Sequence, residues 1–238
     1  MAKILVVKFV YGDKMSLTEN FPINPSYEYF LEKIKSYISP EEINCIFEIG
    51  SRDAIESIYF ENDFKKARIY AFEPNPNQYK KCLQNILEGK AERVKAEPYA
   101  LSDKVGEVDF YITHGNVGAS SLLRPQFVPW TPNQNVDKIK VFSITTDTFC
   151  AKEKIKPDLI WMDVQGNELN VLKGAKNILH NVKVIYTEAG VIPYYEGHTL
   201  KDDIVKYLAD FNFEMVDDKL DWSHESNVLF VNRQILMG

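Results

Sequence analysis

Short apolar runs alternate along this chain with segments in which apolar residues recur every three or four positions. The runs are typical of buried strands, and the spaced segments are typical of amphipathic helices. This alternation predicts parallel strands joined by crossover helices, and therefore an α/β fold with a doubly wound Rossmann-like sheet and helices on both faces. The expected strands are 43–50, 68–73, 94–101, 106–112, 139–144, 158–164, 182–189, 213–217 and 227–232.

The two ends of the chain depart from this alternation. Before the first strand, apolar residues at helical spacing predict a lead-in helix that covers one edge of the sheet. After the last helix, two strands follow without a further crossover, which predicts an antiparallel hairpin at the other edge. We therefore expect a lead-in segment (1–42) and one domain (43–238). The apolar positions of the lead-in helix are Tyr27, Phe30, Leu31, Ile34 and Ile38.

One stretch in the middle of the domain, residues 113–138, has no periodicity and contains several glycines and prolines. Loops of this length inside a compact domain are often lids or binding loops. This insertion either forms part of a binding pocket or, through Phe127 and Trp130, packs on a neighbouring subunit of a homo-oligomer. The sequence leaves both open.

Composition limits the possible binding partners more than it limits the possible folds. The 238 residues include 28 Lys and Arg against 34 Asp and Glu, a net charge of −6, with 45% hydrophobic residues. This acidity argues against a nucleic-acid partner, because phosphate binding needs a basic surface. No apolar stretch matches a signal peptide or a membrane span, so we expect a soluble cytoplasmic protein with no membrane partner. The three cysteines, Cys45, Cys82 and Cys150, are predicted to be reduced and buried.

Carboxylates mark the ends of the expected buried strands. Glu48, Glu73, Asp163 and Glu188 each lie at or just before the carboxyl end of a strand. In open α/β sheets, ligands bind beyond these ends, where the strand order reverses. A carboxylate that ends an apolar strand is costly unless it is paired or belongs to a site. These four residues therefore predict a site at this edge of the sheet.

The spacing of the first two strand ends indicates the ligand. Glu73 follows Gly50 by 23 residues, close to the roughly 20-residue offset at which an acid accepts hydrogen bonds from ribose hydroxyls. A nicotinamide cofactor would need the turn G-x-G-x-x-G to hold its pyrophosphate, and only one of those glycines is present. An adenosine ligand without phosphate, S-adenosylmethionine, fits better. An NAD-dependent oxidoreductase remains the less favoured alternative.

The ordered blocks IFEIGSRDAIES, YAFEPNP, YALSD, TTDTF, IWMDVQGNELNVLKGA and TEAG resemble the FkbM-type family of S-adenosylmethionine-dependent methyltransferases over residues 43–190. The resemblance implies that Gly50 and Ser51 lie against the methionine part of the cofactor and that Glu73 holds the ribose. The chain departs from the family pattern at Arg52, where Asn is common in the family, and at Ala54, where the family usually has a second glycine. We take the alanine to narrow the pocket without closing it.

The strand ends and the resemblance together give the cofactor-binding candidates. The resemblance also implies that Leu101 and Ser102 flank the adenine and that Asp163 faces the centre of methyl transfer. The full set is Glu48, Gly50, Ser51, Arg52, Asp53, Glu73, Pro74, Asn75, Ala100, Leu101, Ser102, Asp163 and Val164.

Methyl transfer from a sulfonium to a hydroxyl requires an in-line arrangement and removal of a proton. Asp163, Glu188 and Glu168 are the candidates for the catalytic carboxylates. We therefore expect O-methylation of a small-molecule, glycan or polyketide-like acceptor. A metal held by Asp163 and Glu188 is a weaker alternative, because no third ligand can be named. The acceptor-binding candidates are Ser120, Ser121, Arg124, Gln165, Tyr194, Tyr195 and His198.

Each of these acids also has a purely structural interpretation. Glu73 would cap the helix that follows it, and Glu48 would pair with Arg52 or Arg68. Asp163 would cap the helix that begins near residue 167, and Glu168 would complement the dipole of that helix. The other alternative function is a catalytically silent nucleoside-binding module of the same fold.

Overall fold

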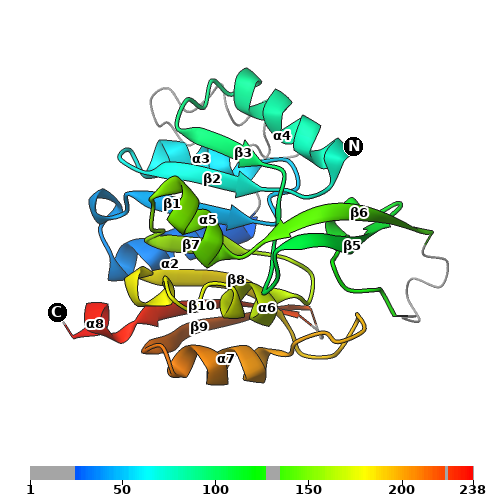
Figure 1. Cartoon of the computed structure of the whole chain (residues 1–238). Coiled ribbons are helices and arrows are strands. Elements are labelled where there is room, and N and C mark those ends of the chain that lie inside the picture. The colour runs from blue at the N-terminus through cyan, green and yellow to red at the C-terminus, as the bar shows by residue number, and fades with distance from the viewer. Residues whose placement is uncertain (1–24, 127–134, 223–224, 238) are drawn as a thin grey trace, which may run out of the picture.

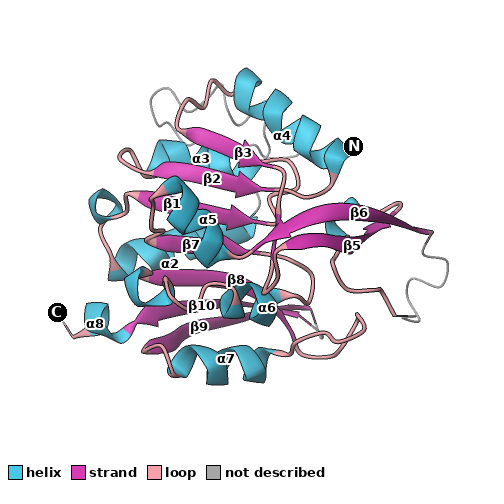
Figure 2. Ribbon diagram, in the orientation of Figure 1, coloured by secondary structure: helices cyan, strands magenta, loops and turns pink. Residues whose placement is uncertain are grey.

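The structure is a computed structural model that describes residues 25–126, 135–222 and 225–237. Its core is a seven-stranded sheet in the order β3-β2-β1-β7-β8-β10-β9, shown in Figures 1 and 2. Five strands are parallel, and a C-terminal antiparallel hairpin completes one edge, as the sequence predicts. The parallel strands are β1 (Cys45–Ile49), β2 (Arg68–Phe72), β3 (Val94–Glu97), β7 (Leu159–Met162) and β8 (Val184–Gly190), and the hairpin is β9 (Phe213–Trp222) and β10 (Glu225–Asn232).

Helices cover both faces of this sheet, and each face has its own apolar core. On one face lie α2 (Pro25–Tyr37), α3 (Ile55–Asp63) and α4 (Pro76–Glu88). On the other lie α5 (Thr146–Glu153), α6 (Glu168–Lys173) and α7 (Lys201–Ala209). The doubly wound arrangement is therefore confirmed. Shorter elements are the 3₁₀ turns η1 (Pro40–Glu42), η2 (Val117–Ala119) and η3 (Leu179–Asn181) and the terminal α8 (Arg233–Leu236).

The lead-in helix exists as predicted, but its position differs. Instead of covering a sheet edge, α2 packs on the face of the central strands β7 and β8. The Tyr27 ring lies 5.8 Å from Trp161, and the Phe30 ring lies 4.7 Å from Tyr186. These strands present the two largest aromatic rings of this face, stacked 3.6 Å apart. Burying the apolar surface of these two rings stabilises the fold more than covering an edge of the sheet would.

The region that the sequence assigns to one strand, 94–101, is divided between two sheets. It breaks at Pro98, which has no N–H for a ladder. β3 ends at Glu97, and β4 (Ala100–Leu101) joins a separate three-stranded sheet with β5 (Gly106–Thr113) and β6 (Val136–Ile144). β5 and β6 project away from the main sheet in Figure 1. The expected insertion 113–138 is thus partly a hairpin, and Phe127 and Trp130 lie outside the described residues.

The three cysteines lie in the apolar cores on the two faces of the sheet. Cys45, Cys82 and Cys150 are free and buried, as predicted, and burial raises the pKa of each thiol to about 12. Among the residues that the structure describes, none of the helices has the length and apolar character needed to cross a membrane.

Candidate active site

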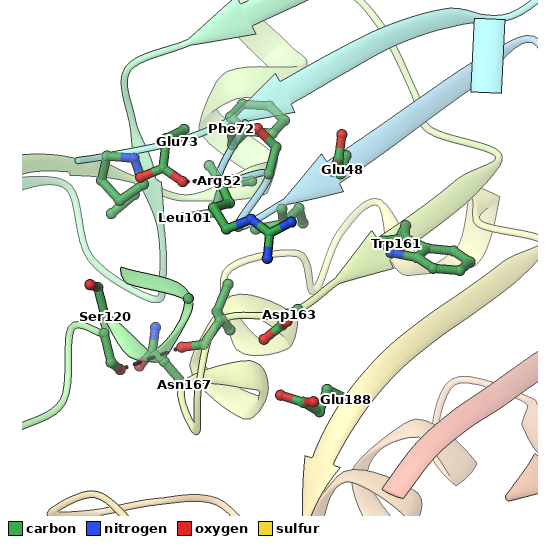
Figure 3. Close-up of a pocket in the computed structure, with 18 of the residues that line it drawn as sticks. Glu48, Arg52, Phe72, Glu73, Leu101, Ser120, Trp161, Asp163, Asn167 and Glu188 are labelled. Atoms are coloured by element: carbon green, nitrogen blue, oxygen red, sulfur yellow. Dashed lines mark hydrogen bonds between the residues drawn. The ribbon is translucent and has the colours of Figure 1, made fainter. Parts of the chain in front are cut away.

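A pocket of about 490 Å³ opens at the carboxyl ends of the parallel strands. This size is within the usual range for small-molecule sites. Its walls come from the ends of β1, β2, β7 and β8, from β4, and from the segment 117–122 that precedes the undescribed part of the insertion. Figure 3 shows Glu73 and Leu101 on one side of the pocket and Glu48 and Trp161 on the other, with Asp163 between them.

The loop after β1 fixes the base of the pocket. Gly50 has a φ of +86°, and a Cβ built there would lie 1.8 Å from the backbone oxygen of Asp163. Only glycine allows this close approach of the two strand ends. Arg52 and Ala54 also have positive φ values, of 53° and 60°. For that reason α3 does not begin until Ile55.

Glu73 follows β2 and points into the pocket. One carboxylate oxygen accepts a hydrogen bond from the Arg52 N–H at 2.8 Å, and the other accepts from the Asn75 N–H at 2.7 Å. Burial raises the pKa of Glu73 to about 7, although these two bonds oppose the rise. The cap of α4 is Asn75 and not Glu73. Each oxygen of Glu73 therefore keeps a lone pair for a ligand.

Glu48 is buried in β1 on the opposite side of the pocket. Its carboxyl group accepts a hydrogen bond from the Ser57 hydroxyl. In the part of the chain that the structure describes, Glu48 forms no ion pair with Arg52 or Arg68, and Arg52 pairs with Asp53 instead. Burial, followed by the charge of nearby Glu56, raises its pKa well above the ordinary value. Glu56, from the first turn of α3, also lines the pocket, and burial raises its pKa as well. Glu48 is thus a buried part of the pocket wall, and its surroundings disfavour the charged form of its carboxyl group.

Asp163 and Glu188 are brought together at the ends of β7 and β8. The side-chain nitrogen of Gln165 lies 2.7 Å from Asp163 Oδ1 and 2.6 Å from Glu188 Oε2. Burial raises the pKa of both carboxyl groups, and the neighbouring Asp163 raises that of Glu188 further. The pair is therefore suited to hold one proton and one negative charge. Asp163 does not cap α6, whose N-cap is Asn167.

Glu168 lies beneath this region and is not among the pocket-lining residues. Its Oε1 accepts hydrogen bonds from the N–H groups of Val164 at 3.3 Å and Gly166 at 3.0 Å. Burial raises its pKa to about 8. Glu168 therefore has a structural role: it holds the loop after β7 and does not line the pocket.

Most of the predicted cofactor residues line the pocket, and three do not. Asp53 pairs with Arg52 at 3.4 Å and Lys81 at 3.5 Å outside it. Asn75 caps α4, and the Ser102 hydroxyl bonds Asp103 at 3.2 Å. The predicted cofactor residues that do line it are Glu48, Gly50, Ser51, Arg52, Glu73, Pro74, Ala100, Leu101, Asp163 and Val164.

Of the predicted acceptor residues, Ser120 and Ser121 line the pocket. Arg124 instead forms an exposed pair with Glu196 at 3.8 Å. Tyr194 is buried beside Tyr195 in a small apolar cluster. The pairing of residues 124–126 with residues 194–196 draws this cluster away from the pocket.

The His198 ring is packed between two glycines, Gly166 and Gly190. A Cβ at Gly190 would lie 2.4 Å from its Nε2, and one at Gly166 would lie 2.9 Å from its ring. Its Nδ1 accepts a hydrogen bond from the Tyr194 N–H at 3.0 Å. Burial lowers the pKa of His198 to about 4, so the ring is neutral at pH 7. It does not line the pocket.

Several lining residues have no counterpart in the sequence prediction. Phe72 and Trp161 are read in the sequence as ordinary core positions of buried strands. Asn167, the N-cap residue of α6, is buried, and its side-chain nitrogen has no hydrogen-bond partner among the described residues. The strand-end rule could have found Glu56 and Asn167 by extension into the following helices. Other lining residues beyond the prediction are Ser26, Ile49, Tyr99, Phe110, Val117, Gly118, Leu122, Tyr186, Lys219 and Asn227.

The fold and the position of the pocket define a class. The magnesium protoporphyrin IX methyltransferase (ChlM) from Synechocystis PCC 6803, solved with bound SAM, superimposes with a TM-score of 0.51 at 9% identity, over 87% of this chain and 78% of that one. The present chain has the Rossmann-like fold of S-adenosylmethionine-dependent methyltransferases.

Sequence comparison gives the family. The Methyltransferase FkbM domain matches residues 48–215. The 2-O-methyltransferase NoeI of Sinorhizobium fredii is 31% identical over 175 residues, which span 70% of this chain and 71% of NoeI. The hexuronic acid methyltransferase AglP of Haloferax volcanii is 25% identical, over 71% of this chain and 63% of AglP. The chain therefore belongs to the FkbM family of methyltransferases, and the nicotinamide alternative is set aside.

Proposed function

We propose that S-adenosylmethionine binds along the side of the pocket formed by Gly50, Glu73 and Leu101. The free lone pairs of Glu73 suit the two neighbouring hydroxyls of a ribose. Leu101, Phe72 and Val164 offer apolar walls to the adenine. When bound, the cofactor supplies an electrophilic methyl group on a positively charged sulfur.

The charge of the pocket supports a cationic cofactor. Its described lining includes five carboxyl groups, from Glu48, Glu56, Glu73, Asp163 and Glu188, against the two cations of Arg52 and Lys219. Burial raises the pKa of all five carboxyl groups, and each one that ionises attracts the sulfonium and the ammonium group of the cofactor. The acidic lining of the pocket therefore fits S-adenosylmethionine.

The acceptor is, in this proposal, a hydroxyl group of a sugar or a similar polyhydroxylated small molecule. Two relatives of this chain are named as a 2-O-methyltransferase and a hexuronic acid methyltransferase. The remaining side of the pocket is lined by the aromatic residues Trp161 and Tyr186 and by the polar residues Asn227 and Lys219. Aromatic rings beside polar groups suit a sugar ring. The acidic lining favours a neutral sugar over a uronate.

The observation that carries this function is the Asp163–Glu188 pair, which faces the pocket between these two sides. Asp163, as the more acidic partner, accepts the proton of the acceptor hydroxyl while the protein holds that oxygen in line with the methyl group. Such base assistance is typically worth about 10²–10⁴-fold in rate.

The first test is calorimetric titration with S-adenosylhomocysteine, beside NAD and with Glu73→Ala for comparison. We expect micromolar binding of S-adenosylhomocysteine that Glu73→Ala loses, and no binding of NAD. The second test is transfer of labelled methyl from S-adenosylmethionine to a panel of neutral methyl pyranosides and the matching uronates.

We expect turnover of a neutral pyranoside, lowered at least about 100-fold in Asp163→Asn and Glu188→Gln. Near-full turnover in both variants would contradict the assigned base. Binding of S-adenosylhomocysteine without transfer to any acceptor would instead favour a silent nucleoside-binding module.

A further inference from the structure

Gln165 does not line the pocket, yet it contacts the two acids that do. It follows β7 with a positive φ of 54°, which turns the chain back toward the sheet edge. Its side-chain nitrogen lies between Asp163 and Glu188, and its side-chain oxygen lies 2.8 Å from the Tyr195 hydroxyl. One amide thus joins both carboxyl groups to the segment that carries Tyr195.

The chemistry of the four groups fixes the direction of these hydrogen bonds. An amide nitrogen has two hydrogens, and here it has two carboxyl oxygens as acceptors. The amide oxygen then accepts from the Tyr195 hydroxyl. The reversed amide would place its oxygen against two carboxyl oxygens, an arrangement that repels unless both acids are protonated. Gln165 therefore donates one hydrogen to Asp163 and one to Glu188.

This arrangement determines which proton the pair can accept. Donation from Gln165 lowers the pKa of Asp163, although burial keeps it raised overall, while the proximity of Asp163 raises the pKa of Glu188. Both hydrogens of the amide are used, one on each acid, and a side-chain hydrogen bond between Asp163 and Glu188 also lowers the pKa of Asp163 and raises that of Glu188. Glu188 holds the proton of the pair.

The same network reaches the other wall of the pocket. The single hydrogen of the Tyr195 hydroxyl is shared between the Gln165 side-chain oxygen at 2.8 Å and the backbone oxygen of Ala119 at 3.0 Å. Ala119 is next to the lining residues Ser120 and Ser121. The Ser121 hydroxyl donates to the backbone oxygen of Gln165 at 2.8 Å. The segment 119–121 and the acid pair are therefore held in one relative position through Gln165.

We propose that Gln165 is a positioning residue that orients the Asp163–Glu188 pair, and that Tyr195 orients Gln165. This inference rests on the proposed function. In the step it serves, the acceptor O–H bond breaks and its proton passes to Asp163, the new oxygen–carbon bond forms, and the carbon–sulfur bond breaks. The electron pair of that bond stays on sulfur, which becomes a neutral thioether.

Three variants test this role. Gln165→Asn keeps an amide and suits the left-handed backbone, but it is one methylene too short to span the network. Gln165→Glu replaces the donating nitrogen with a third carboxyl group. Tyr195→Phe removes only the hydroxyl. The matched control is Tyr207→Phe on α7, whose hydroxyl lies 3.5 Å from the Leu172 carbonyl, far along the chain from this network.

For both Gln165 variants we expect kcat to fall at least about 10-fold at pH 7, with the acceptor KM changed less than threefold. In Gln165→Glu the acidic limb of the kcat/KM profile moves to higher pH by about one unit, because a donor is lost and a like charge is added. Tyr195→Phe shows a smaller fall in kcat, and Tyr207→Phe shows none. Binding of S-adenosylhomocysteine stays within threefold in every variant.

An unchanged kcat and pH profile in both Gln165 variants would overturn the inference. So would loss of S-adenosylhomocysteine binding together with activity, because that result indicates a general structural role. If the wild-type chain binds the cofactor product but methylates no hydroxyl acceptor, the proposed function fails, and this outcome is seen before any variant is compared.

Discussion

At the scale of single residues, Glu73 shows how burial prepares a carboxylate for a ligand. It is 6% exposed, and two backbone N–H groups fix its orientation. Its pKa of about 7 makes its charge sensitive to pH in the neutral range. A ribose that donates two hydroxyl hydrogens binds the ionised form more tightly than the protonated form.

The affinity for S-adenosylhomocysteine should therefore depend on pH. Glu73 is ionised above its pKa and protonated below it, so affinity is highest at alkaline pH. We expect the dissociation constant to rise about 10-fold between pH 8 and pH 6. Calorimetry at pH 6, 7 and 8 measures this change. Glu73→Gln should bind more weakly and lose the dependence, and a dependence that persists in this variant would assign it to another group.

At the scale of elements, the loop after β1 depends on one close contact between strand ends. Gly50 and Gly115 both have a φ of +86°, but a Cβ at Gly115 would meet nothing within 4 Å. The two glycines thus separate the cost of the backbone conformation from the cost of the contact with Asp163.

Alanine at these two positions should have very different effects. Gly115→Ala incurs only the left-handed conformation, about 1–2 kcal/mol of unfolding free energy. Gly50→Ala adds a backbone clash that pushes β1 and β7 apart, so we expect it to cost several kcal/mol more, or to prevent folding. Urea unfolding at pH 7 measures both. Equal losses would show that the approach of Gly50 to Asp163 is unimportant.

The elements that sequence could predict are those with a strong local pattern. The buried runs of β1, β2, β7 and β8 and the helical spacing of α2 are local properties, and all are found. The placement of α2 on a face instead of an edge depends on Trp161 and Tyr186, more than 120 residues away in the chain. The break at Pro98 was visible in the sequence, but the second sheet that it allows depends on pairing between β5 and β6.

At the scale of the whole molecule, some residues of the candidate site could be predicted from the sequence and others could not. The strand-end acids Glu48, Glu73, Asp163 and Glu188 all line the pocket, because parallel strands bring their carboxyl ends to one edge. Lys219 and Asn227 could not be predicted, since they reach the pocket only through the pairing of β9 and β10 beside β8. Tyr195 and His198 do not line the pocket. The hydroxyl partners of Tyr195, Gln165 and Ala119, lie in loops far away in the sequence, and His198 is held by the neighbouring Tyr194 and Tyr195.

Buried acids at this edge also set how the stability of the whole domain depends on pH. Glu168 has a pKa of about 8 in the folded protein, against 4.5 as the ordinary value. Between these values the unfolded chain releases the proton and the folded chain keeps it. The folded state therefore binds more protons in this window, so stability falls as pH rises through it. Glu73, Asp163 and Glu188 have raised pKa values of the same sign.

We expect the unfolding free energy to be highest near pH 5 and to fall toward pH 8, with a contribution from Glu168 on the order of 3 kcal/mol. Glu168→Gln imitates the protonated form, since its side-chain oxygen can still accept the N–H bonds of Val164 and Gly166. Urea unfolding at pH 5, 6, 7 and 8 should show a much shallower fall for this variant, with the remaining slope due to the other acids. The exposed Glu107→Gln serves as a control that leaves the slope unchanged. If Glu168→Gln keeps the full slope, the proton that stabilises the fold lies elsewhere, and the Asp163–Glu188 pair becomes the place to look for it.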